Sequence, residues 1–299
     1  MKKIGYFLLP VVTGLILSSC GGDDNKGDEL DNNTDSTKTE TNNNTAVTET
    51  FFQVPSPGEM LTFIKLVGGK NNKNTTFLNS PENQKNYTDA KSKALNFGIY
   101  SCDLSYCSIF DIGAEALKYF KTVKQMGDQI GVANTIKPEI MKRLEGNLGN
   151  ADSLAVITDD VYFNSFDELE RGKQGTTLAL VVSGGWIESL FICTNLSKYE
   201  ANSPVIERLA DQKYTLENLV EFLKKHEADK NVEAVKKDFE GLLAEFDKIE
   251  QKDVKITAAE EKAKKMLGGG GKQLVLSQEL YTAIVEKIKT IRNSYTLSK

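Results

Sequence analysis

The sequence predicts an all-α protein, a multi-helix bundle built around a buried central helix at about 178–195. Two observations carry this prediction. Apolar residues recur at helical spacing along most of the chain after residue 56, as expected for helices that each turn one face to a core. The stretch LALVVSGGWIESLFIC at 178–193 is apolar nearly all the way round, which is typical of a helix surrounded by others.

The first half of the chain shows clear helix starts. Ser56-Pro57-Gly58-Glu59 reads as an N-cap, a proline at the first helical position and a capping-box glutamate. This helix is predicted to end at the glycines 68–69. The Asn-rich stretch 70–86 is predicted to be a loop, with a turn of helix starting at Ser80-Pro81. Further helices are predicted at 88–110, 113–130, 138–144 and 152–170, the last capped by Asp152 or Ser153.

The second half of the chain is helical with one exception. A helix opens at Ser203-Pro204 and is predicted to bend near Lys213. Two more helices are predicted, one at 232–246 with near-heptad apolar spacing and one at about 277–292. The exception is the alternation in 253–257 and 272–276, which predicts one short β-hairpin near 253–276.

The first 19 residues have the order of regions of a secretory signal peptide. Two lysines precede a short apolar run, and Ser18 and Ser19 precede Cys20. The sequence Leu17-Ser18-Ser19-Cys20 resembles the lipobox of bacterial lipoproteins. The resemblance implies cleavage before Cys20 and acylation of that cysteine, which anchors a protein to a membrane without spanning it. An ordinary signal peptide with an incidental cysteine is the alternative.

Residues 20–50 form a separate compositional region. They contain eight acids and two lysines, a net charge of −6, and almost no apolar residues. Such a segment cannot bury enough apolar surface to offset its ordering entropy, so we expect a disordered tether. The acids after Cys20 resemble the export signal of surface lipoproteins in the Bacteroidota. This resemblance implies an outer-membrane, cell-surface location, with the periplasmic leaflet as the alternative.

The net charge of the remaining chain limits the classes of partner that it can bind. The whole sequence carries −5, so residues 51–299 carry −1 once the tether and the two signal-peptide lysines are set aside. A nearly neutral region argues against nucleic-acid binding, which depends on a large basic surface. About 250 residues suffice for one substantial core, and no linker-like composition interrupts them, so 51–299 is predicted to be a single helical domain.

Cysteine and histidine content restricts the chemistry further. If Cys20 is acylated, Cys102, Cys107 and Cys193 remain, an odd number. We expect buried thiols that fill core space, with a bridge from Cys193 to either of the other two as the alternative. His226 is the only histidine and is expected at a solvated helix end. These residues do not make a zinc pattern, and no metal or cofactor is predicted.

Two carboxylates in apolar surroundings are the candidate site residues. Asp103 lies in YSCDLSYC, and Glu188 lies within the central helix in GGWIESLF. Burying a carboxylate is costly unless it is paired or hydrogen-bonded. The functional hypothesis is a ligand pocket, because perturbed carboxylates often mark sites. The structural alternative is a hydrogen-bonded core network. The hypothesis places in the pocket Tyr100, Asp103, Tyr106, Trp186 and Glu188.

Glycines predict which helices bring these carboxylates together. Gly98 lies on the helix that carries Asp103, and Gly184-Gly185 lie on the central helix. Residues without side chains permit close backbone approach, so the two helices can pack directly against each other.

Three segments carry a family resemblance: KALNFGIYSCDLSYCSIFD, ALVVSGGWIESLFI and VEKIKTIRNSYT. Together they resemble an uncharacterised group of helical lipoproteins of the Bacteroidota. The resemblance implies origin and export and no defined activity. We therefore expect a non-enzymatic, membrane-anchored binding or accessory protein whose partner is a small ligand or an envelope protein. The alternatives are a structural envelope protein that contacts only other proteins and, less favoured, an enzyme that uses Asp103 and Glu188.

Overall fold

The computed structural model describes residues 56–67, 72–253 and 272–297. Helices make up most of these residues, and a two-stranded antiparallel sheet is the one sheet among them, so the predicted all-α bundle with a short hairpin is confirmed. The described residues share one contiguous apolar core. The predicted signal peptide and tether, residues 1–19 and 20–50, lie outside the described residues.

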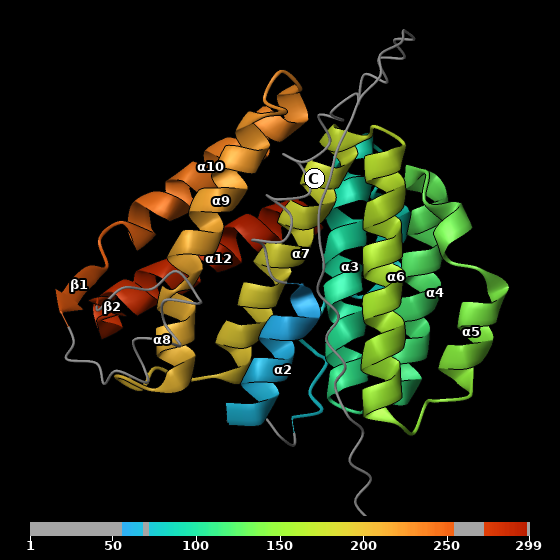
Figure 1. Cartoon of the computed structure of the whole chain (residues 1–299), viewed down its shortest axis with the longest axis horizontal. Helices are drawn as coiled ribbons and strands as arrows, with labels where there is room; N and C mark the ends of the chain where they lie inside the picture. The colour runs from blue at the N-terminus through green and yellow to red at the C-terminus, as the bar shows by residue number, and fades with distance from the viewer. Residues whose placement is uncertain (1–55, 68–71, 254–271, 298–299) are drawn as a thin grey trace, which may run out of the picture. The chain divides into compact units, whose positions relative to one another are not determined.

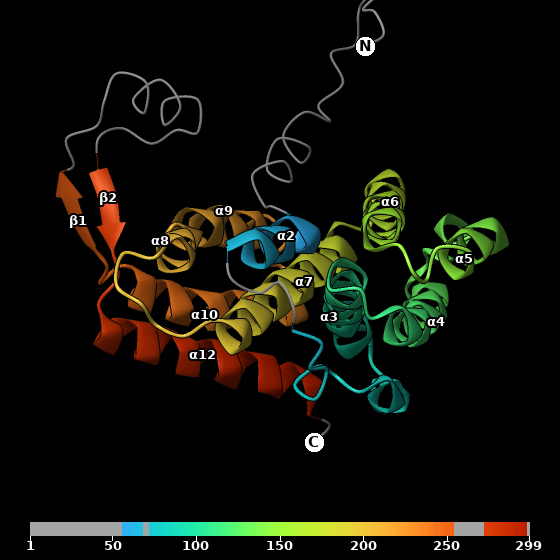
Figure 2. The same ribbon diagram turned by 90° about the horizontal axis from the view of Figure 1, so that it is seen from below.

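Helix α7 (Gly175–Leu196) is the central element (Figures 1 and 2), and every residue from Leu178 to Cys193 is buried. Of the described helices, α7 alone is long and apolar enough to cross a membrane, but 83% of its apolar window is buried inside the protein. The helix is longer than the predicted 178–195. Its burial by other helices, and not a short length, identifies it as a core helix.

Helix α3 (Ala90–Ile109) packs along α7 through glycine contacts (Figure 2). A methyl group on Gly98 would collide with the backbone carbonyl oxygen of Val181, and one on Gly184 would collide with that of Leu95. The two backbones are therefore too close for any side chain at these positions. This confirms the predicted close approach of the two helices.

Of the remaining N-terminal elements, α2 (Pro57–Val67) and α6 (Ala151–Arg171) pack on both α3 and α7, and α4 (Gly113–Ile130) packs on α3. In α2 the Glu59 amide donates to the Ser56 hydroxyl, as the cap sequence predicts. Asn150 caps α6, where Asp152 or Ser153 was predicted, because the Asn150 side chain accepts from the Ser153 amide. The other elements of this half are η1 (Pro81–Asn86), η2 (Ala133–Thr135) and α5 (Pro138–Glu145).

The C-terminal elements lie on the other side of α7 (Figure 2). The predicted bend near Lys213 is a break at Asp211, between α8 (Pro204–Ala210) and α9 (Gln212–Lys224). In α10 (Lys230–Phe246) the near-heptad residues are all fully buried, as predicted. Helix α12 (Gln278–Thr296) begins at its Ser277 cap, packs on α7 and reaches α3.

The hairpin pairs β1 (Glu250–Asp253) with β2 (Lys272–Val275), and Glu250 lies opposite Val275. The first strand begins three residues earlier than the predicted 253–257. The rest of that predicted strand, from residue 254, lies outside the described residues.

We predict that Gly98→Ala destabilises the protein by about 1–3 kcal/mol or more, because the added methyl group collides with backbone that cannot rotate away. Urea denaturation measures the free energy of unfolding. Gly149→Ala is the matched control, since no atom lies within 4 Å of its added methyl group. Equal stability of the two variants would contradict the close packing of α3 and α7.

Candidate functional site

The two candidate carboxylates meet a cation in the core. Asp103 on α3 and Glu188 on α7 are both fully buried. Arg292, near the end of α12, donates from Nε to one Glu188 oxygen at 2.8 Å and from Nη2 to the other at 2.9 Å. This two-bond arrangement is the strongest geometry available to a carboxylate and a guanidinium, and it leaves Glu188 paired.

Arg292 is held by further contacts. Its guanidinium lies 4.4 Å from the centre of the Phe191 ring, within cation–π range. Its Nη2 also donates to the backbone oxygen of Phe77 at 3.4 Å. Burial lowers the pKa of Arg292, but the charge and hydrogen bonds of Glu188 outweigh burial and raise it. Arg292 therefore stays charged.

Asp103 is less well satisfied than Glu188. Its Oδ2 accepts the Asn79 amide at 3.3 Å, while its buried Oδ1 has no hydrogen-bond partner among the described residues. Burial raises the pKa of Asp103 well above its usual range, and the neighbouring Glu188 raises it further. Arg292 opposes this shift and does not cancel it. Asp103 is thus a buried carboxyl group whose pKa is raised.

An uncharged polar network adjoins the cluster. Asn79 donates from Nδ2 to the Tyr87 hydroxyl at 3.0 Å and to Asn96 Oδ1 at 3.1 Å. Tyr87 and Asn96 donate in turn to the backbone oxygens of Thr296 and Tyr295, each at 2.9 Å. The network joins the stretch before α3, α3 itself and the end of α12.

The three predicted aromatic site residues are also in the core. Tyr100 donates to the backbone oxygen of Ser80 at 2.8 Å, and Tyr106 donates to those of Asn72 and Asn74 at 3.2 and 3.0 Å. Both tyrosines therefore hold the stretch 72–80.

Trp186 lies on a different side of α7 from this stretch. It donates to Gln212 Oε1 at 3.2 Å, and its ring centre is 5.4 Å from that of Phe239. The structure thus brings Asp103 and Glu188 together, while Trp186 belongs to the contact with α9 and α10.

Sequence reasoning missed Arg292 and Asn79. Arg292 follows Ile284 and Ile288 at steps of four, so it continues the apolar stripe of its helix. A cation on a buried stripe is the signal that could have indicated a buried partner. Asn79 carries no comparable signal, because its stretch has no periodicity.

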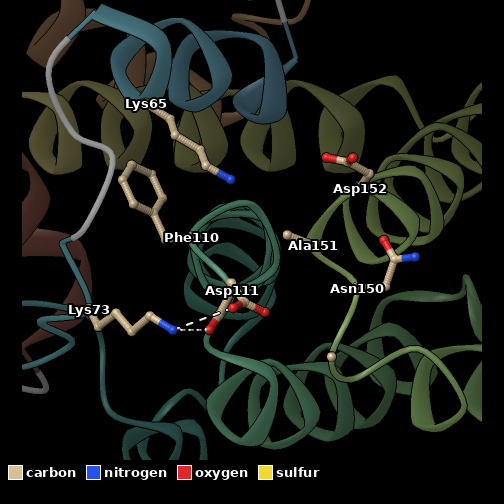
Figure 3. A pocket seen from close by; sticks show the side chains of 8 residues that line it. Lys65, Lys73, Phe110, Asp111, Asn150, Ala151 and Asp152 are labelled. Carbon is tan, nitrogen blue, oxygen red and sulfur yellow. Dashed lines mark hydrogen bonds and ion pairs between the residues drawn. The ribbon is translucent and has the colours of Figure 1, made fainter.

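Two hollows on the described part of the chain do not include any of the predicted site residues. The first, of about 490 Å³, lies at the C-terminal end of α3 and the start of α6 (Figure 3). Lys65 donates to the Ile109 carbonyl, and Lys73 donates to the backbone and side-chain oxygens of Asp111 at 2.9 and 3.4 Å. The two lysines thus compensate the negative end of α3.

The second hollow, of about 710 Å³, is a groove between the end of α2 and the stretch leading into α8. Its apolar lining includes Val67, 40% exposed, and the half-buried Leu196 and Val205. Polar side chains also line it, among them the exposed Lys198 and Glu200. Its apolar lining residues and tyrosine are Ile64, Val67, Leu196, Tyr199, Ala201, Pro204 and Val205.

Reactive groups elsewhere are buried or isolated. The predicted buried thiols are confirmed, since Cys102, Cys107 and Cys193 are all free and buried, and burial raises their pKa values. His226 is half-buried against Gly175 and the Phe222 ring, so the expected solvated position is wrong in part. Burial lowers its pKa. The described residues contain no His, Cys, Asp and Glu group able to hold a metal ion.

Comparison with models of protein families, with curated proteins and with solved structures found no match to this chain. The class defined by the fold and site is therefore a helical bundle with a buried Asp–Glu–Arg cluster. The resemblance to helical lipoproteins of the Bacteroidota stays a prediction from the sequence.

We predict that Arg292→Met and Glu188→Leu each destabilise the protein by about 3–5 kcal/mol, because each leaves one buried partner without its counterpart. The double variant Glu188→Leu/Arg292→Met should lose much less stability than the two single variants lose together, since it leaves no member of the pair unpaired. A double-mutant cycle from urea denaturation measures this coupling.

The control for this cycle is the exposed pair Lys118–Glu115, whose closest atoms are 2.7 Å apart. Truncating Lys118 should change stability by about 1 kcal/mol or less, because solvent screens exposed pairs. Additive losses at Glu188 and Arg292 would show that the buried pair does not act as a unit.

Proposed function

We propose that this chain is a lipid-anchored bacterial envelope protein that acts as a non-enzymatic binding or accessory protein, and that its partner is another protein. The lipobox-like Leu17–Cys20 supports the anchor, and the acidic residues after it support placement in the outer membrane at the cell surface. The pairing of Glu188 inside the core carries the rest of the proposal.

That pairing argues for a structural role of the carboxylates. A binding or catalytic carboxylate needs access to its ligand, whereas Asp103 and Glu188 are fully buried and Glu188 has both oxygens bound by Arg292. Internal hydrogen bonds also engage the polar side-chain atoms of Tyr100, Tyr106 and Trp186. The groove at the end of α2 offers an accessible surface instead, with apolar side chains such as Val67 beside the charged Lys198 and Glu200.

A structural envelope protein is the second candidate. Both candidates use protein contacts, and they differ in whether the contact is permanent. The groove and the adjacent Leu66, which is 68% exposed, favour a partner that binds reversibly. The interface of a permanent complex is usually larger and more apolar.

We predict that Cys20→Ala abolishes incorporation of a labelled fatty acid and moves the protein from the membrane fraction to the soluble fraction. Cys193→Ala is the matched control. This variant should keep the fatty-acid label, because the Cys193 thiol is buried in α7 and is not expected to be acylated. Acyl labelling that survives in Cys20→Ala would refute the anchor. Protease added to intact cells distinguishes the cell surface from the periplasmic leaflet.

We predict that Val67→Asp weakens partner binding at least tenfold without lowering the melting temperature, because the change places a charge in an exposed apolar groove. Crosslinking in intact cells measures partner capture. Val156→Asp is the control, since Val156 is 58% exposed on α6 and does not line the groove. Ligand-induced stabilisation in a thermal-shift screen of glycans and metabolites, with unchanged crosslinking, would favour a small ligand instead.

A further inference from the structure

The buried cluster contains more acid than base. Arg292 uses two of its nitrogens on the two oxygens of Glu188, and it is the one cation in contact with either carboxylate among the described residues. Asp103 has one oxygen on the Asn79 amide and one with no donor. A fully buried carboxylate oxygen without a donor is expensive, because nothing replaces the water it has lost.

A proton on Asp103 removes this cost. Asp103 and Glu188 lie on helices α3 and α7, whose backbones touch at Gly98 and Gly184, and both side chains are fully buried. Two neighbouring carboxyl groups can share a hydrogen bond only when one of them carries a proton. We propose that Asp103 holds a proton that it donates to Glu188, and that this proton fastens the stretch 72–80 over the buried cluster. With the proton in place the cluster is neutral.

Other titratable groups near Asp103 do not supply a compensating charge. They come from α3, from α4 and from the end of the stretch before α3. Burial raises the pKa of each of them, so they are uncharged at neutral pH. Besides Glu188 and Arg292, the titratable groups that interact electrostatically with Asp103 are Tyr87, Tyr100, Cys102, Cys107 and Tyr119.

The stretch 72–80 covers the cluster directly. The Asn79 amide donates to Asp103, and the Phe77 carbonyl accepts from Arg292. Apart from a turn at 75–78, the stretch has no regular structure, and tyrosines of α3 hold its two ends. Segments with few backbone hydrogen bonds open at the lowest free energy. Displacing this stretch is therefore the route to Asp103 that costs water entry the least free energy.

Loss of the proton has a defined consequence. Asp103 and Glu188 would then be two negative charges that share one guanidinium in a dry core, and they would repel each other. Hydration relieves the repulsion, so the stretch 72–80 is expected to open as the pH rises. The cluster acts as a pH-sensitive fastening that stays closed as long as Asp103 holds its proton.

Urea denaturation of the full chain in detergent at pH 5, 6, 7 and 8 tests the proton, with Asp103→Asn as the comparison. The unfolded chain loses the Asp103 proton near pH 3.9, while the folded chain keeps it. The unfolding constant of the wild type divided by that of Asp103→Asn should therefore rise with pH, by up to tenfold per pH unit, until the folded chain also loses the proton. A ratio that does not change with pH would overturn the proposal.

Asp159→Asn is the matched control for this measurement. Burial raises the pKa of Asp159 to about 6, with Glu59 and Asp160 as further causes. The unfolding constant of the wild type divided by that of Asp159→Asn should rise only up to about pH 6 and then stay level. The two aspartates thus have distinguishable pH windows in the same protein.

Hydrogen exchange on the wild type tests the fastening and does not depend on the variant folding. Intrinsic amide exchange rises tenfold per pH unit through base catalysis. The exchange rates of the amides at 76–80 should rise more steeply with pH once Asp103 loses its proton. The exchange rate of the Leu242 amide in α10 should keep the intrinsic slope. Equal slopes up to pH 10 would overturn the fastening. An infrared carboxylic-acid band at pH 8 supports the proton in wild type, and absence of that band would overturn it.

Discussion

Glu188 imposes the constraint on which the rest of the structure depends. It lies in the middle of the most buried helix, where an unpaired carboxylate would outweigh the net stability of an ordinary domain. A cation delivered by another element compensates it, and Arg292 of α12 is that cation. The position of the C-terminal helix against α7 is therefore tied to one charge.

The same requirement organises the surroundings of the cluster. Arg292 binds the carbonyl of Phe77, and Asp103 binds the amide of Asn79, so the charged groups hold a stretch that has little regular structure. Close contact between α3 and α7 at Gly98 and Gly184 sets how near the two carboxyl groups lie. Packing of backbone and placement of charge are thus two parts of one arrangement, and a shared proton completes its neutrality.

This arrangement explains why buried acids do not by themselves mark an active site. Perturbed carboxylates are common where substrates are processed, yet structural ion pairs perturb them too. Here the perturbed group, Asp103, is fully buried and engaged internally, and the exposed apolar surface lies elsewhere, at the end of α2. The buried cluster and the exposed groove therefore lie in different parts of the molecule.

The sequence by itself determined the helices, because periodicity and caps such as Ser56 and Ser277 are local. It also determined which segment is central, since a helix apolar on all sides must be surrounded. Only the tertiary structure decided that Arg292 neutralises Glu188 from 104 positions away and that Asn79 covers Asp103. Such contacts depend on how helices pack in three dimensions, and a local pattern carries no information about distance between elements.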